Sequence, residues 1–322
     1  FQIELNLPLL VREPGKLFVE TGDRLRRCDP QRSRPPVELL DPPHVVLADP
    51  LIDRGRDLLA PAFESLEPTG ERTEVHELIA AVDIVLPRMG HDFHVLADND
   101  AAAVPPGADA SSIAMLLEHW SDVVGIPTPL VSGAGTHNAC VLLPTAPPLL
   151  RLGNNLWMQG DQQSWRGLAA VALARQAWGA PLARALPSLE LDLLIATAFE
   201  TVRVFNAITA DPDPRRLQEM SAQVGKHIPR KNRKSLEKAC ASLTGHEFAP
   251  SATARATQAS DLRLAALLSG DVGGVLSAAC LLDGVAGGAL KQRINRSSLA
   301  QSLLGFLLGD DFLELRAIAF AP

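Results

Sequence analysis

The run GLAAVALARQAW, residues 167–178, decides the fold class of this chain. It is rich in Ala and Leu and contains no Gly or Pro after its first residue, so it predicts a helix. The helical pattern continues from residue 163 almost to the end of the sequence. Its breaks contain Gly or Pro and fall at residues 179–181, 211–214, 245–250 and 284–288. The C-terminal half is therefore expected to be a bundle of helices.

A small sheet is expected just before this bundle. Cys140–Leu143 and Leu149–Leu152 are short apolar runs separated by a Pro-rich turn, which predicts a β-hairpin or two neighbouring strands. We therefore expect an α+β fold that is mainly helical, with the sheet at about residues 131–152 against the helices.

The N-terminal part is expected to be a separate α/β segment. It would cover residues 1–108 and include a Pro/Arg-rich linker, and the helical domain would cover residues 109–322. Strands are expected within residues 1–43. The further predictions are a strand at 44–51 and helices at 52–63, 74–85 and 110–124.

Composition and charge favour an ordinary globular protein. Hydrophobic residues make up 47% and charged residues 21%, and the net charge of −7 provides no general attraction to nucleic acid or an anionic membrane. The cysteines are far apart and form no CxxC pair, so the thiols are expected to be reduced and structural. They are Cys28, Cys140, Cys240 and Cys280. We expect a cytoplasmic protein, because the sequence shows no export signal.

The apolar stretch Leu264–Leu290 raises the question of a membrane span. Asp271 and Asp283 lie inside it, and carboxylates are costly within a bilayer. A pair of buried helices is therefore expected, without a membrane span.

Several short motifs occur in order before the helix at 167–178. They are LEHWSDVVGIPTP at 117–129, NAC at 138–140 and LLRLGNNL at 149–156. Together with that helix they resemble the HtpX-type zinc metallopeptidases (gluzincins), a group that includes the CAAX prenyl endopeptidases. In that family a helix ends in a GIPxP turn before an edge strand. Cys140 departs from the pattern, because the family usually has an aromatic residue there. The resemblance covers about half the chain and implies a metallopeptidase-like helical domain with a short edge sheet.

The resemblance also implies that the zinc ligands are missing. In the family the central helix carries HExxH, in which two histidines hold zinc and the glutamate acts as general base. Here Ala174 and Trp178 stand at the histidine positions and Arg175 stands at the glutamate position. The third family ligand belongs to an ExxxD pattern, where this chain has Thr257 followed by Asp261. Methyl and indole groups do not coordinate zinc, and a guanidinium cannot act as a base at neutral pH.

These vacancies imply a catalytically inactive domain without a metal or cofactor. Its role would be that of a protein-interaction or scaffold component in a larger bacterial assembly, with a protein as its partner. Trp178 is expected to be largely buried between its own helix and the helix around Asp261. Asp261 could support the site from a second layer, as in the enzymes, or pair within the core with Arg175. We expect the pairing, because a buried guanidinium needs a partner.

Two alternative functions use other residues. A metal-dependent hydrolase could use His91 and His94 together with His76, although a polar loop is the favoured interpretation of a lone HxxH. The basic segment Lys226–Lys238 could bind an anionic ligand or nucleic acid. Its candidate contacts are Arg230, Lys231, Arg233 and Lys234. A solvated helix face is favoured for this segment, because no aromatic side chains for base stacking lie nearby and the chain is acidic.

Overall fold

The chain divides into two units, Phe1–Val46 and Leu47–Pro322. A computed structural model describes residues 18–21, 24–27, 73–89, 117–118, 120–121, 125–133, 140–204, 213–244 and 250–319. In the first unit the described residues form an antiparallel pair of strands, β1 (Phe18–Thr21) and β2 (Arg24–Arg27). They lie within the range where the sequence predicts strands.

Some predicted elements lie outside the described residues. These are the strand at 44–51, the helix at 52–63 and the domain boundary at 108–109. Of the helix predicted at 110–124, the structure describes residues 117, 118, 120 and 121, which are helical.

The second unit contains a three-stranded sheet. Its strands are β3 (Leu130–Gly133), β4 (Cys140–Leu143) and β5 (Leu149–Leu152), in the order β3-β5-β4. β3 runs parallel to β5, and β4 runs antiparallel to β5, with Cys140 opposite Leu152. The prediction of neighbouring strands is confirmed.

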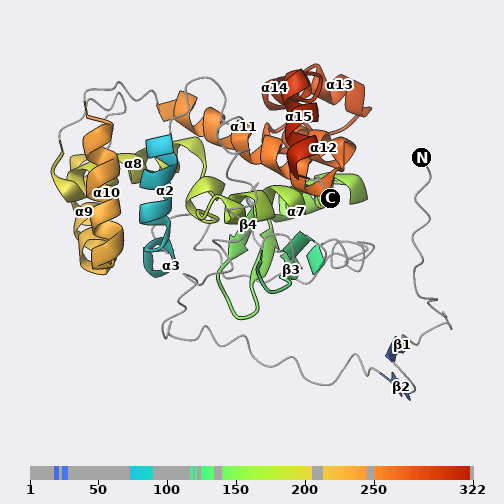
Figure 1. Cartoon of the computed structure of the whole chain (residues 1–322), viewed down its shortest axis with the longest axis horizontal. Helices are drawn as coiled ribbons and strands as arrows, with labels where there is room; N and C mark the ends of the chain where they lie inside the picture. The colour runs from blue at the N-terminus through green and yellow to red at the C-terminus, as the bar shows by residue number, and fades with distance from the viewer. Residues whose placement is uncertain are drawn as a thin grey trace. The chain divides into compact units, whose positions relative to one another are not determined.

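The rest of the described part of this unit is mainly helical, which confirms the predicted fold class (Figure 1). The helices are α2 (Thr73–Asp83), α3 (Leu86–Met89), α6 (Asn154–Gln159), α7 (Gln162–Ala177), η2 (Ala183–Ala185, a 3-10 turn), α8 (Ser188–Val202), α9 (Pro214–His227), α10 (Arg230–Ser242), α11 (Pro250–Ser269), α12 (Val272–Leu282), α13 (Leu290–Ile294), α14 (Ser298–Leu307) and α15 (Asp310–Ala319).

α7 is the central helix of the unit. Asp161 caps its N-terminus by accepting a hydrogen bond from the Ser164 backbone N–H at 2.8 Å, and the helix ends before Gly179, which has a φ of 74°. Its apolar residues face all directions, and α7 packs against α11, α12 and β4. Gly167 permits a close crossing, because a Cβ there would collide with the backbone of Gly274 on α12.

The apolar stretch Leu264–Leu290 forms the end of α11 followed by α12, which confirms the predicted helix pair. Asp271 separates the two helices and caps α12, accepting a hydrogen bond from the Gly274 N–H at 2.9 Å. Within the described residues, no helix combines the length and apolar character needed to cross a membrane.

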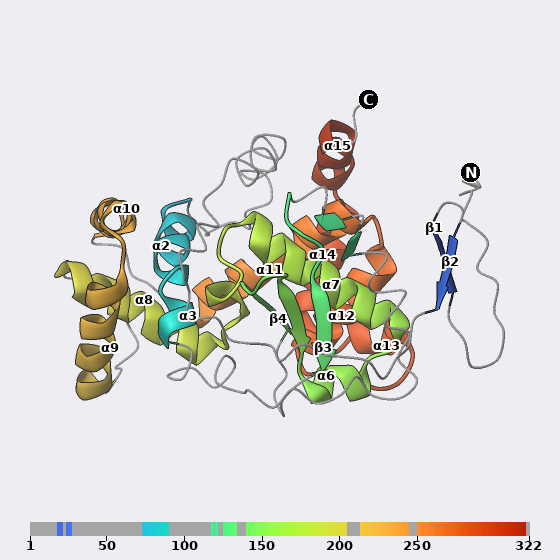
Figure 2. The same ribbon diagram turned by 90° about the horizontal axis from the view of Figure 1, so that it is seen from below.

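Two hydrophobic cores meet along α11. One is formed mainly by α7, α11, α12, α14, α15 and the sheet, and the other by α2, α8, α9, α10 and the segment around η2. Ala254 of α11 belongs to the second core, whereas Leu262 belongs to the first. Figures 1 and 2 show α2, α9 and α10 on one side of α11 and α13–α15 on the other. Side chains in the middle of α11 therefore lie where the two cores join.

Candidate functional site

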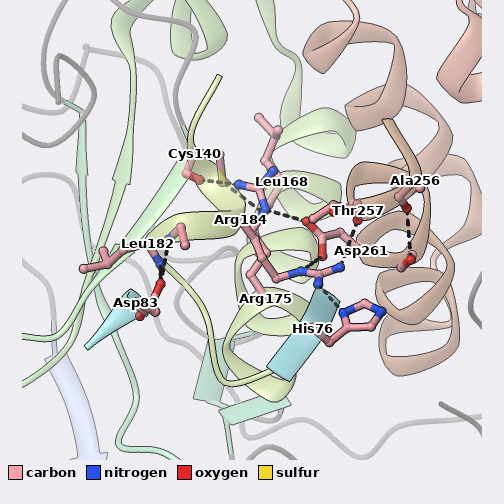
Figure 3. A network of polar contacts seen from close by, with 12 residues as sticks. His76, Asp83, Cys140, Leu168, Arg175, Leu182, Arg184, Ala256, Thr257 and Asp261 are labelled. Atoms are coloured by element: carbon pink, nitrogen blue, oxygen red, sulfur yellow. Dashed lines mark hydrogen bonds and ion pairs between the residues drawn. The ribbon is translucent and has the colours of Figure 1, made fainter. Parts of the chain in front are cut away.

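A buried ion pair joins α7 to α11. Arg175 Nε lies 2.8 Å from Asp261 Oδ2, and both side chains are almost completely buried. The Arg175 guanidinium also donates a hydrogen bond through Nη1 to the Cys140 carbonyl of β4 at 2.7 Å (Figure 3). The predicted pairing of Arg175 with Asp261 is confirmed.

A second arginine, Arg184 of η2, binds the same carboxylate. Its Nε lies 2.6 Å from Asp261 Oδ1. Its Nη2 donates to the Thr257 carbonyl at 3.0 Å, and its Nη1 lies 2.7 Å from His76 Nδ1. The sequence analysis missed Arg184, although one signal was present: Arg184 is a lone charge within the apolar run from Leu182 to Leu186.

Trp178 lies against this cluster and is 6% exposed, so its predicted burial is confirmed. Its ring stacks on His76, with centroids 4.6 Å apart and planes 9° from parallel. The Arg184 Cζ lies 4.9 Å from the Trp178 centroid, within the range of a cation–π contact. α7 and α11 pack together as expected, but these ring contacts come from α2 and η2, which were not predicted to reach Trp178.

The remaining singled-out positions lie next to the same cluster. Thr257 is one turn before Asp261 on α11, and its carbonyl accepts the hydrogen bond from Arg184. Ala174 is one turn before Trp178 on α7 and is fully buried. Of the five positions, Arg175 and Asp261 contact each other, Thr257 and Trp178 each contact Arg184, and Ala174 lies on the adjacent turn of α7.

The charges of the cluster are two guanidiniums and one carboxylate. A guanidinium has only donors, so His76 Nδ1 must accept its hydrogen bond, which places the ring proton on Nε2 and leaves the ring neutral. Each oxygen of Asp261 already accepts from an arginine Nε. This arrangement holds its members in place through charge-assisted hydrogen bonds.

The thiol nearest the cluster is not suited to act as a nucleophile. Burial raises the pKa of Cys140 to about 12, and the Coulombic effect of Arg175 lowers it only in part. The Cys140 Sγ donates to the Leu168 carbonyl at 3.2 Å. The reactive form of cysteine is the thiolate, so Cys140 is inert at neutral pH.

Asp83 holds η2 from the same helix that carries His76. Its Oδ1 accepts from the Leu182 N–H at 2.9 Å and the Ala183 N–H at 2.6 Å. Burial raises the Asp83 pKa to about 7, although these two hydrogen bonds lower it. α2 therefore positions Arg184 through His76 and Asp83, neither of which the sequence analysis assigned to this role.

The metal hypothesis receives no support from the described residues. His76 faces a guanidinium, which repels a cation, and His91 and His94 lie outside the described residues. Within the described ranges, no group of three or more His, Cys, Asp or Glu side chains could hold a metal ion. The described cysteines are free and buried, as expected. They are Cys140, Cys240 and Cys280, and Cys28 lies outside the described residues.

The basic segment lies on the end of α9 and on α10. Its four candidate contacts, Arg230, Lys231, Arg233 and Lys234, are all exposed on α10. Arg233 Nε lies 3.2 Å from Glu237 Oε1, in an exposed pair that contributes little to stability.

Comparison with known proteins gives no match for this chain, whether to a protein-family model, a curated protein or a solved structure. The resemblance to the HtpX-type metallopeptidases therefore stays a prediction from the sequence.

Proposed function

We propose that the helical unit is a catalytically inactive metallopeptidase-like domain that serves as a protein-interaction or scaffold component of a larger bacterial assembly. The observation that carries this proposal is the buried cluster of Arg175, Asp261 and Arg184 between α7, α11 and η2. Of these elements, α7 and α11 are the helices on which the resemblance places the zinc ligands.

Charge supports the proposal. In the family the aspartate at the position of Asp261 supports, from a second layer, a site that holds a divalent cation. In this chain two guanidiniums supply the same formal charge of +2 to the same carboxylate. Removing a cation from near a buried carboxylate carries a large desolvation cost, which a replacement cation offsets.

The contacts of the Trp178 ring support the proposal as well. The Trp178 indole, which offers a donor and no ligand atom, stacks flat on His76 and lies beside Arg184. A zinc ion at this place would face two cations instead of the anionic or neutral ligands that it needs.

The network suits a scaffold because it fixes several elements at once. Hydrogen bonds from the two arginines connect α7, η2 and α11 to β4 and α2. A fully paired polar network rigidifies a fold and specifies one arrangement of its elements. A rigid body can present its outer surface to a partner with little ordering cost.

Restoring the zinc site tests the proposal. The variant would combine Ala174→His, Trp178→His and Thr257→Glu with Arg184→Met, which removes the cation that contacts both Trp178 and Thr257. The matched control carries the last three substitutions and keeps Ala174, so it lacks one ligand.

If the fold is metallopeptidase-like, the restored variant will retain one zinc per chain after dialysis and the control will retain substantially less, as measured by elemental analysis. Circular dichroism verifies that both are folded. A folded restored variant that holds no more zinc than the control would refute the resemblance.

A further inference from the structure

α10 presents a stripe of positive charge to the outside. The stripe consists of Arg230, Lys231, Lys234 and Lys238, which are all exposed. With about 3.6 residues per turn, Arg230, Lys234 and Lys238 follow one another on one face, and Lys231 lies beside them. The side chains that α10 buries are on the opposite face. They are Leu236, Ala239 and Cys240.

The charge of this region is opposite to that of the chain. Residues 213–244 carry eight Lys and Arg against three Asp and Glu, a net charge of +5. The whole chain carries 30 against 37, so the remainder is at −12. No cation of the stripe forms an ion pair within the described part of the chain, whereas neighbouring Arg233 pairs with Glu237.

The stripe also begins where positive charge opposes helix formation. Arg230 and Lys231 lie in the first turn of α10, which contains no acidic residue and starts at Pro229 without a side-chain cap. Cations near a helix N-terminus interact unfavourably with the helix dipole. Stability of α10 therefore does not explain the placement of these two residues.

We propose that the stripe is a docking surface for an acidic helical segment of a partner protein. This rests on the scaffold role proposed above and names the chemistry of its partner. Glutamates at positions i, i+4 and i+8 of a helix repeat about every 6 Å, the same spacing as Arg230, Lys234 and Lys238. A short segment bound along the stripe lies within a Debye length, about 8 Å, of its cations, so salt screens their attraction only in part.

Other polyanions fit the surface less well. α9 and α10 contain no Phe, Trp or Tyr on which the bases of a single strand could stack. The large hydrophobic side chains exposed in the described residues lie on other elements, so this face has no apolar group to insert into a membrane. A long duplex would also be repelled by the net negative charge of the chain as a whole.

The test uses the full chain and a fluorescent helical peptide with glutamates at i, i+4 and i+8, followed by anisotropy. The stripe variant carries Arg230→Glu, Lys234→Glu and Lys238→Glu. The control reverses three exposed cations elsewhere, Arg255, Lys291 and Arg316, and changes the net charge by the same amount.

We expect the stripe variant to bind the peptide at least about tenfold more weakly than the natural chain, and the control to stay within about twofold. Binding by the natural chain should weaken as salt rises from 50 to 200 mM. Equal binding by both variants, or no binding by the natural chain, would overturn the proposal. So would tighter stripe-dependent binding of a 20-base-pair DNA duplex or of vesicles containing phosphatidylserine. Zinc restoration does not involve α10, so either proposal can fail alone.

Discussion

Replacing Asp261 with Asn should destabilise the helical unit more than any other single change in the cluster. The substitution keeps the shape of the side chain but places an amide NH2 against one arginine Nε, and it leaves two buried guanidiniums without a carboxylate. Breaking one buried ion pair by removing one partner costs about 3–5 kcal/mol. Since Asp261 serves two arginines, we expect at least this loss in the free energy of unfolding.

Urea denaturation at pH 7.5, followed by circular dichroism, measures this loss. With an m-value of about 3 kcal/mol per M, the midpoint should fall by about 1–1.7 M. Arg175→Met should cost less than Asp261→Asn, because it leaves Asp261 paired with Arg184.

Asp192→Asn is the matched control. Asp192 of α8 is 6% exposed, and its Oδ1 has no hydrogen-bond partner within the described residues. Burial raises the Asp192 pKa to about 6, so its charge is unfavourable to folding at pH 7.5 and its removal should leave stability unchanged or increased. The reasoning is refuted if the free energy of unfolding of Asp261→Asn is within about 0.5 kcal/mol of that of the natural chain. It is also refuted if Asp192→Asn lowers the free energy of unfolding as much as Asp261→Asn does.

Three further predictions address helix contacts and titration. The Asp83 pKa is raised to about 7, so its contribution to stability is fully present below pH 3.8 and is lost as pH rises through 7. Asp83→Asn keeps the acceptor oxygen but does not titrate. The free energy of unfolding of this variant, relative to that of the natural chain, should therefore rise by about 2–3 kcal/mol from pH 5 to pH 8 in urea titrations. A difference that stays constant over this range would contradict the prediction. Gly167→Ala should lower the free energy of unfolding by about 1–3 kcal/mol, because the added Cβ would collide with α12. Gly305→Ala on α14 is the control. A Cβ there meets nothing within 4 Å, so this variant should raise the free energy of unfolding by up to about 1 kcal/mol. Equal thermal shifts for the two glycine variants would be evidence against the close crossing. Burial raises the pKa values of the buried thiols, so these thiols should not react with iodoacetamide at pH 8 until urea unfolds the chain. Mass spectrometry would identify the labelled cysteines. Rapid labelling of the folded protein would contradict their burial. They are Cys140, Cys240 and Cys280.

The helices and the small sheet were predictable because they depend on local patterns. Ala- and Leu-rich runs, Gly and Pro breaks and capping aspartates are all visible in the sequence. The separation of α9 from α10 was not predicted, although Pro229 marks it, because the basic run around it was interpreted as one helix face. The division into two cores that meet on α11 depends on tertiary packing and has no local signal.

Two of the three charged members of the buried cluster, Arg175 and Asp261, could be predicted, for a physical reason. Arg175 lies within an apolar helix and needs a buried partner, and Asp261 has the same need on another apolar helix. Arg184 was not predictable in this way, because it lies in a short 3-10 turn whose orientation is set by hydrogen bonds to Asp83. Asp83 is 100 residues from Ala183 in the sequence, so only the fold brings them together.

The zinc content of the natural chain tests the central claim most directly. After equilibration with zinc and dialysis, elemental analysis should find well below one zinc per chain, because the cations of Arg175 and Arg184 fill the place between α7 and α11. One tightly held zinc per chain, together with peptide cleavage that a chelator abolishes, would contradict the account. If His91→Ala then removed that zinc, the metal-dependent hydrolase would take its place.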